Sequence, residues 1–421
     1  MEEEPRRILI FNPTFFPDPE VCSIRATQFA RHLPAHRWIP SIVCIRRGDD
    51  PREDAEKLAR FVHPAVAIEH VAVSSAPGSE PPPRSRLRSL RWSLAKRLLG
   101  ELVWARFWWG MRYRCLDAAR RLGPDVLLTS SPPVGIHVVG HWLSTRMSLP
   151  WVADFREAYL ADPRFRPKGV PTILWPLARR YEASLYRQAT LLIHQLPVHA
   201  RWARRRYAFA RHKIAVLVNG FPADVELDPA SRPADSGGCC VTTVGSTGEK
   251  EAWVLALAVA ALARTGIDVR LRMVGRPLCN LGEIRTLLGS RVEHPGQVPH
   301  QEALREIQRA TVVVSALSPS RQQGLMICTK LIEYIAAGKP IVAINPTFSE
   351  RLFLRPFSDA EILQDPTPAA LAAALLRSLA RARSSPPDRQ DFRDRFSWRS
   401  RTADLAALLN QVVDSRATLR N

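Results

Sequence analysis

Short apolar runs alternate along this chain with stretches in which apolar residues recur at helical spacing. Most runs are continuous in valine, isoleucine and leucine, a pattern typical of parallel strands buried on both faces. They predict ten strands, at Ile8–Asn12, Ser41–Cys44, Val126–Thr129, Trp151–Ala153, Leu191–His194, Ala215–Val218, Val241–Val244, Arg270–Val274, Thr311–Ser315 and Ile341–Ala343. Helical patterns lie between them, at Ile24–Leu33, Val134–Arg146, Ala252–Arg264, Gln301–Arg309 and Thr329–Ala337. Strands alternating with helices in this way predict a doubly wound α/β architecture.

The alternating pattern restarts once, which predicts two Rossmann-like domains. The sequence VNGF at 218–221 closes the first series, a polar stretch with prolines runs from Pro222 to Gly238, and a new strand begins at Val241. Such linkers are typical of domain boundaries. We therefore expect an N-terminal domain at 1–221, a C-terminal domain at 222–395 and an amphipathic terminal helix within 396–421. Two further irregular stretches are Ser74–Arg84 and Ser384–Pro387.

Composition places the chain among globular proteins and leaves the meaning of its charge open. Hydrophobic residues make up 46% and charged residues 24% of the 421 residues, which excludes a disordered or fibrous chain. The formal net charge of +20 favours acidic partners, namely nucleic acid, an anionic membrane or phosphorylated small molecules. Only seven of the basic residues are lysines, and alanine and proline are abundant, so a compositional bias of the whole proteome explains the charge equally well.

Cysteine usage and apolar runs bear on the compartment. The 7 cysteines show neither the pairing of a disulfide framework nor the spacing of a zinc site, which favours a reduced cytoplasmic compartment. The N-terminus MEEEPRR lacks the apolar segment of a signal peptide, and the longest apolar run, Ala252–Ala263, is too short to span a bilayer. We expect a soluble protein, or at most one attached to a membrane surface.

Glycine patterns separate the candidate nucleotide sites. The turn after the first predicted strand, NPTFFPDPEVCSIR, has no glycine, which argues against a nicotinamide or flavin site, and no P-loop sequence occurs. In the second half, Gly245-Ser246-Thr247-Gly248 follows a predicted strand and precedes a predicted helix, with Lys250 close behind. Such a turn suits a phosphate group, although turn geometry alone explains it equally well.

The segment 320–344, SRQQGLMICTKLIEYIAAGKPIVAI, carries the strongest signal. Thr329 or Cys328 can cap a helix whose first turns contain Lys330 and Glu333. A cation and unpaired backbone N–H groups then lie at a helix N-terminus on the carboxyl side of the sheet, where open α/β sheets bind phosphorylated ligands. Glu333 is placed to accept hydrogen bonds from a ribose diol.

These motifs resemble a known family when they are taken in order. GxVPHxEAL at 296–304 and KLxEYxAAGKPIVA at 330–343 are similar to glycosyltransferase family 4, and so are Asn12-Pro13 with FFPDP, Arg25, and SSPP at 130–133. The resemblance runs from about Arg7 to Pro346. It implies the GT-B fold, in which two Rossmann-like domains face a cleft and the last helix returns to the first domain. It also implies a retaining transferase that uses a nucleoside diphosphate sugar, with no cofactor and no required metal.

The resemblance also implies roles for individual residues. Glu333 would grip the ribose, Lys330, Lys250 and the Gly245 loop would bind the diphosphate, and the loop Gln297-Val298-Pro299 would lie against the base. The implied donor-binding residues are Gly245, Ser246, Lys250, Val298, Lys330, Leu331 and Glu333. Arg25 is expected on the acceptor side.

Two positions depart from the family pattern. Leu325 stands where the family has a first glutamate that contacts the sugar, and DFRE at 154–157 stands where many members have a histidine. Asp154 and Arg156 are therefore the candidates for catalytic groups near the sugar, and a structural ion pair is the alternative for them. His137 and His141 are expected to be packing or surface residues rather than metal ligands.

The acceptor is expected to be a glycan, a lipid-linked sugar or a polysaccharide, and a catalytically silent binding subunit remains the alternative function. Nonspecific nucleic-acid binding is a weaker one, because the arginines are spread along the chain and no specific module is visible. The stretch Arg84–Arg114 has one acid, Glu101, and combines arginines with a leucine stripe and Trp92, Trp104, Trp108 and Trp109. It suits peripheral attachment to an anionic membrane, or else the stripe packs on the first domain.

Overall fold

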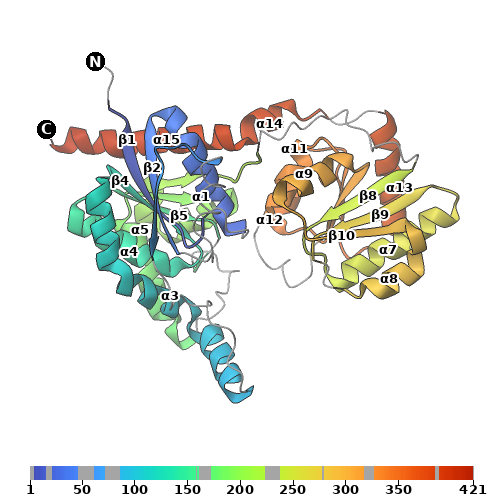
Figure 1. The fold of residues 1–421 in the computed structure, drawn as a ribbon, viewed down its shortest axis with the longest axis horizontal. Coiled ribbons are helices and arrows are strands. Elements are labelled where there is room, and N and C mark those ends of the chain that lie inside the picture. Colours follow the sequence, from blue (N-terminus) through green and yellow to red (C-terminus); the bar gives the residue numbers. More distant parts are fainter. Residues whose placement is uncertain are drawn as a thin grey trace. The chain divides into compact units, whose positions relative to one another are not determined.

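The computed structural model describes residues 4–15, 21–45, 61–71, 86–157, 159–160, 172–222, 238–276, 279–316, 327–384 and 388–420 (Figure 1). The irregular stretch Ser74–Arg84 and Leu325 lie outside these residues. The chain divides into two compact units, one of Met1–Val218 with Trp398–Asn421 and one of Asn219–Ser397. The division falls just before the boundary expected from the sequence.

The first unit contains a seven-stranded sheet in which every neighbouring pair of strands is parallel. Its strands are β1 (Arg6–Phe11), β2 (Trp38–Ile45), β3 (Ala67–Val71), β4 (Val126–Ser131), β5 (Trp151–Phe155), β6 (Leu191–His194) and β7 (Ile214–Val216), in the order β3-β2-β1-β4-β5-β6-β7. Its helices are α1 (Val21–His32), α3 (Arg86–Leu122), α4 (His137–Met147), α5 (Trp175–Gln188), α6 (Pro197–Arg206) and α15 (Trp398–Arg420), with short 3-10 turns η1 (Leu33–His36), η2 (Val134–Ile136), η3 (Thr172–Leu174) and η4 (Ala208–Lys213).

Alternation along β1 builds two separate cores on the faces of this sheet. Ile8 and Ile10 face a core that includes side chains of α1 and α15, whereas Leu9 and Phe11 face a core built with α3, α4, α5 and α6. Successive side chains of a strand point to opposite faces, so a continuous apolar run is what such a buried strand requires. Phe29 of α1 meets Trp398 of α15 edge to face, with ring centroids 6.0 Å apart, and α15 thereby packs on the first unit (Figure 1).

The second unit repeats the plan with a six-stranded parallel sheet. Its strands are β8 (Cys239–Val244), β9 (Val269–Val274), β10 (Val292–Gly296), β11 (Val312–Ala316), β12 (Ile341–Ile344) and β13 (Glu361–Leu363), in the order β10-β9-β8-β11-β12-β13. Its helices are α7 (Glu249–Arg264), α8 (Leu281–Leu288), α9 (His300–Arg309), α11 (Thr329–Ala336), α12 (Phe348–Leu354), α13 (Pro368–Ser384) and α14 (Gln390–Phe396), with a 3-10 turn η5 (Gly289–Arg291). Side chains of α7, α8 and α13 pack together against one face of the sheet.

Each sheet starts in its middle and grows first to one side and then to the other. The reversal falls between β1 and β4 in the first sheet and between β8 and β11 in the second. Ligands of open α/β sheets bind outside the carboxyl ends of the strands at such reversals. The predicted doubly wound α/β class is confirmed, and the two reversals mark where each unit can hold a ligand.

The structure adds three strands to the ten that the sequence predicts. β3, β10 and β13 were not expected, and each lies at an edge of its sheet. Across the described ranges, no helix is both long enough and apolar enough to cross a bilayer.

Candidate functional site

Three neighbouring strands of the second sheet lead into glycines at their carboxyl ends. Gly245 follows β8, Gly275 follows β9 and Gly296 ends β10, with φ of +88°, +115° and +84°. Glycine adopts this left-handed region without the steric cost that other residues meet. The Gly245 N–H donates to the Val274 carbonyl and the Gly275 N–H to the Gly296 carbonyl, each at 2.8 Å. A Cβ on Gly275 would lie 3.0 Å from the Gly245 backbone, so this edge consists of bare main chain that a ligand can approach closely.

Gly245 also begins the loop that leads from β8 into α7, at the reversal of the strand order. Gly245 is exposed and Ser246 is half-buried. Gly248 is the N-cap of α7, and no side chain caps the helix start. The first N–H groups of a helix attract anions, and binding of a phosphate group in this loop stays a prediction. Glu251 in the same turn is buried and accepts a 3.2 Å hydrogen bond from Asn345, and its charge offsets part of that attraction.

The structure brings Lys330 to the Gly245 loop. The Lys330 Nζ donates to the Val244 carbonyl at 3.2 Å, and its Cδ lies 3.9 Å from the position of a Cβ on Gly245. One turn further along α11, the buried Tyr334 hydroxyl accepts a 2.8 Å hydrogen bond from the Val244 N–H. Burial raises the pKa of Tyr334, which keeps its hydroxyl protonated. Two side chains thus join α11 to the end of β8. The Lys330 ammonium lies at the edge of the sheet formed by Gly245, Gly275 and Gly296, which we call the glycine edge.

Lys250, the second predicted diphosphate ligand, is held by a different partner. Its Nζ lies 3.0 Å from Asp365 Oδ1, and both side chains are well exposed. An exposed ion pair of this kind contributes only about 0–1 kcal/mol. An anionic ligand can therefore replace Asp365 at small cost.

Glu333 occupies a more closed setting than the sequence indicated. Its side chain is 6% exposed, and its Oε1 lies 2.7 Å from Nε2 of His300, the first residue of α9. The His300 side chain is 42% exposed, so the imidazole lies on the solvent side of the carboxylate. His300 belongs to the quoted GxVPHxEAL motif, yet sequence reasoning gave it no role.

Leu331 does not fit the ligand role that the resemblance implied. Its side chain is fully buried in the core, and its N–H donates to the Cys328 carbonyl at 2.9 Å. Neither the side chain nor the N–H of Leu331 is therefore available to contact a ligand. Val298 lies half-buried in the loop between β10 and α9, as expected from the sequence order.

Sequence reasoning also missed a buried carboxylate behind α11. Glu350 accepts hydrogen bonds from the Cys328 N–H at 3.1 Å and from the Thr347 N–H at 3.0 Å. Burial raises the pKa of Glu350, while these N–H donors and the nearby Lys330 oppose the rise. The T-x-x-E capping box at Thr347–Glu350 was the available signal. The carboxylate ties the start of α12 to the residue before α11.

The catalytic candidates of the first unit are buried in another arrangement than expected. Asp154, at the carboxyl end of β5, accepts two 3.0 Å hydrogen bonds from Arg25 of α1 and one of 2.8 Å from Ser130. Arg25 also donates to the Leu217 carbonyl at 3.0 Å. The Arg25 and Asp154 side chains are 3% and 1% exposed. The prediction that Arg25 faces the acceptor is corrected, because its guanidinium is turned inward to Asp154.

Arg156 lies beside this pair without joining it. Its guanidinium donates to the Ser131 carbonyl at 3.0 Å and to the Pro132 carbonyl at 3.1 Å. The structural ion pair considered for Asp154 and Arg156 is therefore made by Asp154 with Arg25. Arg156 instead supports the loop that follows β4.

Two buried imidazoles flank the ring of Phe155 at the same edge of the first sheet. The centroids of His137 and His194 lie 4.6 and 5.4 Å from that of Phe155. Nδ1 of His137 is 2.7 Å from the Thr129 hydroxyl. Burial lowers the pKa of His137 to about 3, and for His194 burial, with His199 and Arg204 nearby, lowers the pKa to about 3. His137 is a neutral packing residue, as expected.

Comparison with known proteins agrees with this arrangement. Residues 239–381, within the second unit, match the family model described as Glycosyl transferases group 1. No curated protein matches the chain in sequence.

Solved structures extend the likeness to the first unit. A glycosyltransferase from Rickettsia africae ESF-5 is 11% identical with a TM-score of 0.65, covering 98% of this chain and 99% of that one. A sucrose-phosphate synthase from Thermosynechococcus elongatus is 15% identical with a TM-score of 0.63, covering 97% and 100%. The UDP-GlcNAc 2-epimerase of Neisseria meningitidis bound to UDP-GlcNAc is 12% identical with a TM-score of 0.56, covering 96% and 100%. The chain shares their fold, and the predicted GT-B fold is confirmed.

Proposed function

We propose that this protein transfers a sugar from a nucleoside diphosphate to a glycan, lipid-linked or polysaccharide acceptor, with retention of configuration, because residues 239–381 match the family model described as Glycosyl transferases group 1. The observation that carries the proposal is the position of Lys330, whose ammonium lies at the bare glycine edge where β8 leads into α7. A cation and a helix N-terminus that share one strand reversal suit a diphosphate.

The donor would be bound through its diphosphate and its ribose. Lys330 and the first N–H groups of α7 would take the phosphates, Lys250 would exchange Asp365 for the ligand, and Glu333 would accept from the ribose hydroxyls. In the reaction the bond from the anomeric carbon to the diphosphate oxygen breaks, and the electron pair stays on the diphosphate. The acceptor hydroxyl oxygen forms the new bond to the anomeric carbon, and its proton is taken up by the leaving diphosphate. Lys330 would stabilise the charge that develops on the leaving group, which is the task of a divalent cation elsewhere.

The acceptor would be held by the first unit, at the carboxyl ends of β1, β4 and β5. The buried Arg25–Asp154 pair would form part of the wall there rather than a contact to the sugar. The Arg25–Asp154 contact also supports the alternative function, a catalytically silent subunit that binds the nucleotide sugar. Because Asp154 is engaged with Arg25, Arg156 is the one member of the predicted catalytic pair that remains for a contact to the sugar.

We also propose that the protein works at the inner face of a membrane, where lipid-linked acceptors lie. The support is an exposed aromatic surface made by Trp109, Arg112 and Tyr113 of α3 with Trp142 of α4. The Arg112 guanidinium lies 4.4 Å from the ring centroids of both Trp109 and Tyr113, which are 44% and 59% exposed. Glu101, the one acid of the basic stretch, accepts a 3.2 Å hydrogen bond from the Gly135 N–H and is turned into the unit. Exposed aromatics with arginines favour an anionic bilayer surface.

Calorimetry and a turnover assay test the proposal together. The purified protein is titrated with UDP, GDP, ADP and dTDP and with their sugar derivatives, and release of the nucleoside diphosphate is then measured with and without glycan acceptors. Binding of at least one of these ligands is expected, with acceptor-dependent release. Binding without release or transfer would support the silent subunit, and failure of every nucleotide to bind would refute both functions. The anomeric configuration of the product, read by NMR, decides whether configuration is retained.

A further inference from the structure

The contact between His300 and Glu333 connects α9 with α11. These two helices would place the base loop and the ribose ligand of the nucleotide site. His300 opens α9 directly after the loop Gln297–Pro299, and Glu333 lies on α11. We propose that His300 is a positioning residue: its Nε2–H holds the Glu333 carboxylate so that the second oxygen is presented to the ribose hydroxyls. This inference rests on the proposed function and deepens it.

The direction of the hydrogen bond follows from the chemistry of the two groups. An ionised carboxylate can only accept, so at 2.7 Å the proton must reside on Nε2 of His300. The imidazole has such a proton both in its Nε2–H tautomer and in its charged form. The donor is therefore present whichever of these two forms the ring adopts, and one carboxylate oxygen remains occupied.

Because Glu333 is buried, the orientation of its carboxylate depends on the hydrogen bonds that protein groups donate to it. Glu333 is 6% exposed, and a carboxylate that has left water depends on hydrogen bonds from the protein. Its neighbours on α11 fix the helix itself, since Lys330 donates to the Val244 carbonyl and Tyr334 accepts from the Val244 N–H at the end of β8. The backbone of α11 is thus set by β8, and the side-chain angle of Glu333 is set by α9. Loss of the His300 donor would free that angle without moving the helix.

The contact also links the predicted ribose ligand to the predicted base loop. Val298 lies two residues before His300, in the loop that would lie against the base. A nucleoside has a fixed distance between its base and its ribose hydroxyls. A hydrogen bond that ties the carboxylate to the end of the base loop matches this distance in advance, which lowers the ordering cost of binding.

The test uses pairs of ligands that differ only in the ribose hydroxyls. Wild type, His300→Leu, His300→Gln and the control Gln301→Leu, which alters an exposed neighbour on α9, are titrated with UDP, GDP and ADP and with the 2′,3′-dideoxy analogue of each. They are also titrated with dTDP, which has no 2′-hydroxyl, and with its 3′-deoxy analogue. A hydrogen bond to a charged group predicts that His300→Leu binds the natural nucleotide about tenfold more weakly. The dideoxy analogue should lose almost nothing. His300→Gln, whose amide N–H can replace Nε2–H, should restore most of the affinity.

The outcomes separate this inference from the proposed function. If wild type binds a nucleotide and His300→Leu binds it equally well, or loses the same factor with the dideoxy analogue, the positioning role is wrong and the proposed function stands. If wild type binds none of the four nucleotides, both fall. Should His300→Leu fail to fold, His300→Asn replaces it, because the shorter amide does not reach Glu333. Melting of the free proteins shows which variants are folded.

Discussion

The Arg25 guanidinium meets the Asp154 carboxylate through two hydrogen bonds of 3.0 Å, although 129 positions separate the residues in the chain. Both side chains are buried, and Arg25 also holds the Leu217 carbonyl just before the chain leaves the first unit. The pair therefore joins α1, β5 and the end of the first unit's sheet.

Removal of Asp154 should cost stability before it costs turnover. Asp154→Ala leaves a buried guanidinium without its counter-charge, and we expect the free energy of unfolding to fall by about 3–5 kcal/mol. Urea unfolding measures it. The control is Arg121→Ala, which breaks an exposed pair with Glu69 and should cost no more than about 1 kcal/mol. An Asp154→Asn variant that keeps its stability and loses turnover would instead support the catalytic role expected from the sequence.

The glycine edge predicts a position at which alanine is excluded for two reasons. In Gly275→Ala the left-handed backbone is strained by roughly 1–2 kcal/mol, and the new Cβ meets the Gly245 backbone at 3.0 Å. Gly266→Ala is the matched control, because Gly266 has φ of +85° and open space around it. Melting of the two variants should show the larger loss for Gly275→Ala, and only that variant should weaken nucleotide binding. Equal losses in both would mean that the close approach of the two loops is unimportant.

Chelation of metals should leave nucleotide binding intact. If Lys330 supplies the charge that a divalent cation would otherwise supply, EDTA should not change the dissociation constant of the nucleoside diphosphate that binds. Lys330→Ala should raise that constant about 10- to 100-fold, the range for a hydrogen bond to a charged group. Calorimetry with and without EDTA measures both effects. A loss of affinity in EDTA that Mg²⁺ restores would contradict the proposed role of Lys330.

Acid should destabilise the first unit through His137 and His194. Burial lowers the pKa of each to about 3, whereas an unfolded histidine titrates near 6.5. Between these values the unfolded chain binds protons that the folded unit does not. Stability is therefore fully present above about pH 6.5 and falls by about 1.4 kcal/mol per pH unit for each histidine as the pH drops toward 3.

Unfolding measured from pH 7 to pH 4 checks this slope. His137→Asn should reduce the pH dependence of the unfolding free energy by the contribution of one histidine, about 1.4 kcal/mol per pH unit. Val139→Ala, on the same helix and also fully buried, should lower stability by a similar amount at every pH and leave the slope unchanged. A His137→Asn slope equal to that of wild type would show that the ring is protonated in the folded unit.

The sequence predicts those strands whose pattern of apolar residues is visible within the strand itself. All ten predicted strands exist, and most of them are continuous apolar runs of the kind that strands buried on both faces require. The three missed strands, β3, β10 and β13, lie at sheet edges, and their sequences AIEHV, VEHPG and EIL mix polar with apolar residues, so they show no continuous apolar run.

The candidate site was predictable up to its tertiary contacts. The motif at 330–343 located Lys330 and Glu333, since their place after β11 follows from chain order. The partners of these residues lie on other elements: Glu333 meets His300 of α9, and Lys330 meets Val244 of β8. Asp154 likewise meets Arg25 rather than Arg156, two positions away. Residue spacing gave no information about these pairings, which depend on how helices pack on the sheets.

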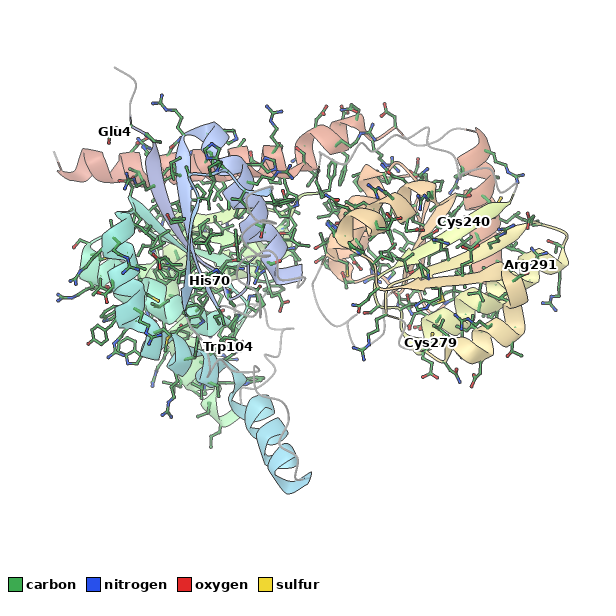
Figure 2. All side chains as sticks on the ribbon, viewed as in Figure 1. Glu4, His70, Trp104, Cys240, Cys279 and Arg291 are labelled. Atoms are coloured by element: carbon green, nitrogen blue, oxygen red, sulfur yellow. The ribbon has the colours of Figure 1, made fainter. Side chains whose placement is uncertain are left out.

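Helix α3 shows the same limit and leads to the last prediction. The sequence grouped Trp92, Trp104, Trp108 and Trp109 as aromatics for a membrane surface, with packing on the first domain as the alternative. The side chain of Trp92 lies outside the described residues. Trp108 is fully buried, and Trp104, labelled in Figure 2, packs against the core of the first unit, whereas Trp109 is 44% exposed. Adjacent helical positions point about 100° apart, and only packing decides which one faces water. The exposed surface of Trp109, Arg112, Tyr113 and Trp142 is therefore the part to test.

Flotation with liposomes should depend on this surface and on lipid charge. Wild type should float with vesicles that contain phosphatidylglycerol at low salt and should stay behind with neutral phosphatidylcholine vesicles. Trp109→Ser combined with Tyr113→Ser should cut the floated fraction several-fold, because interfacial binding scales with the apolar area that enters the lipid. The matched control is Phe209→Ser, which removes an exposed aromatic from η4 outside this surface. Wild type that never floats, or a double variant that floats as well as wild type, would leave Trp109 and Tyr113 without a membrane role.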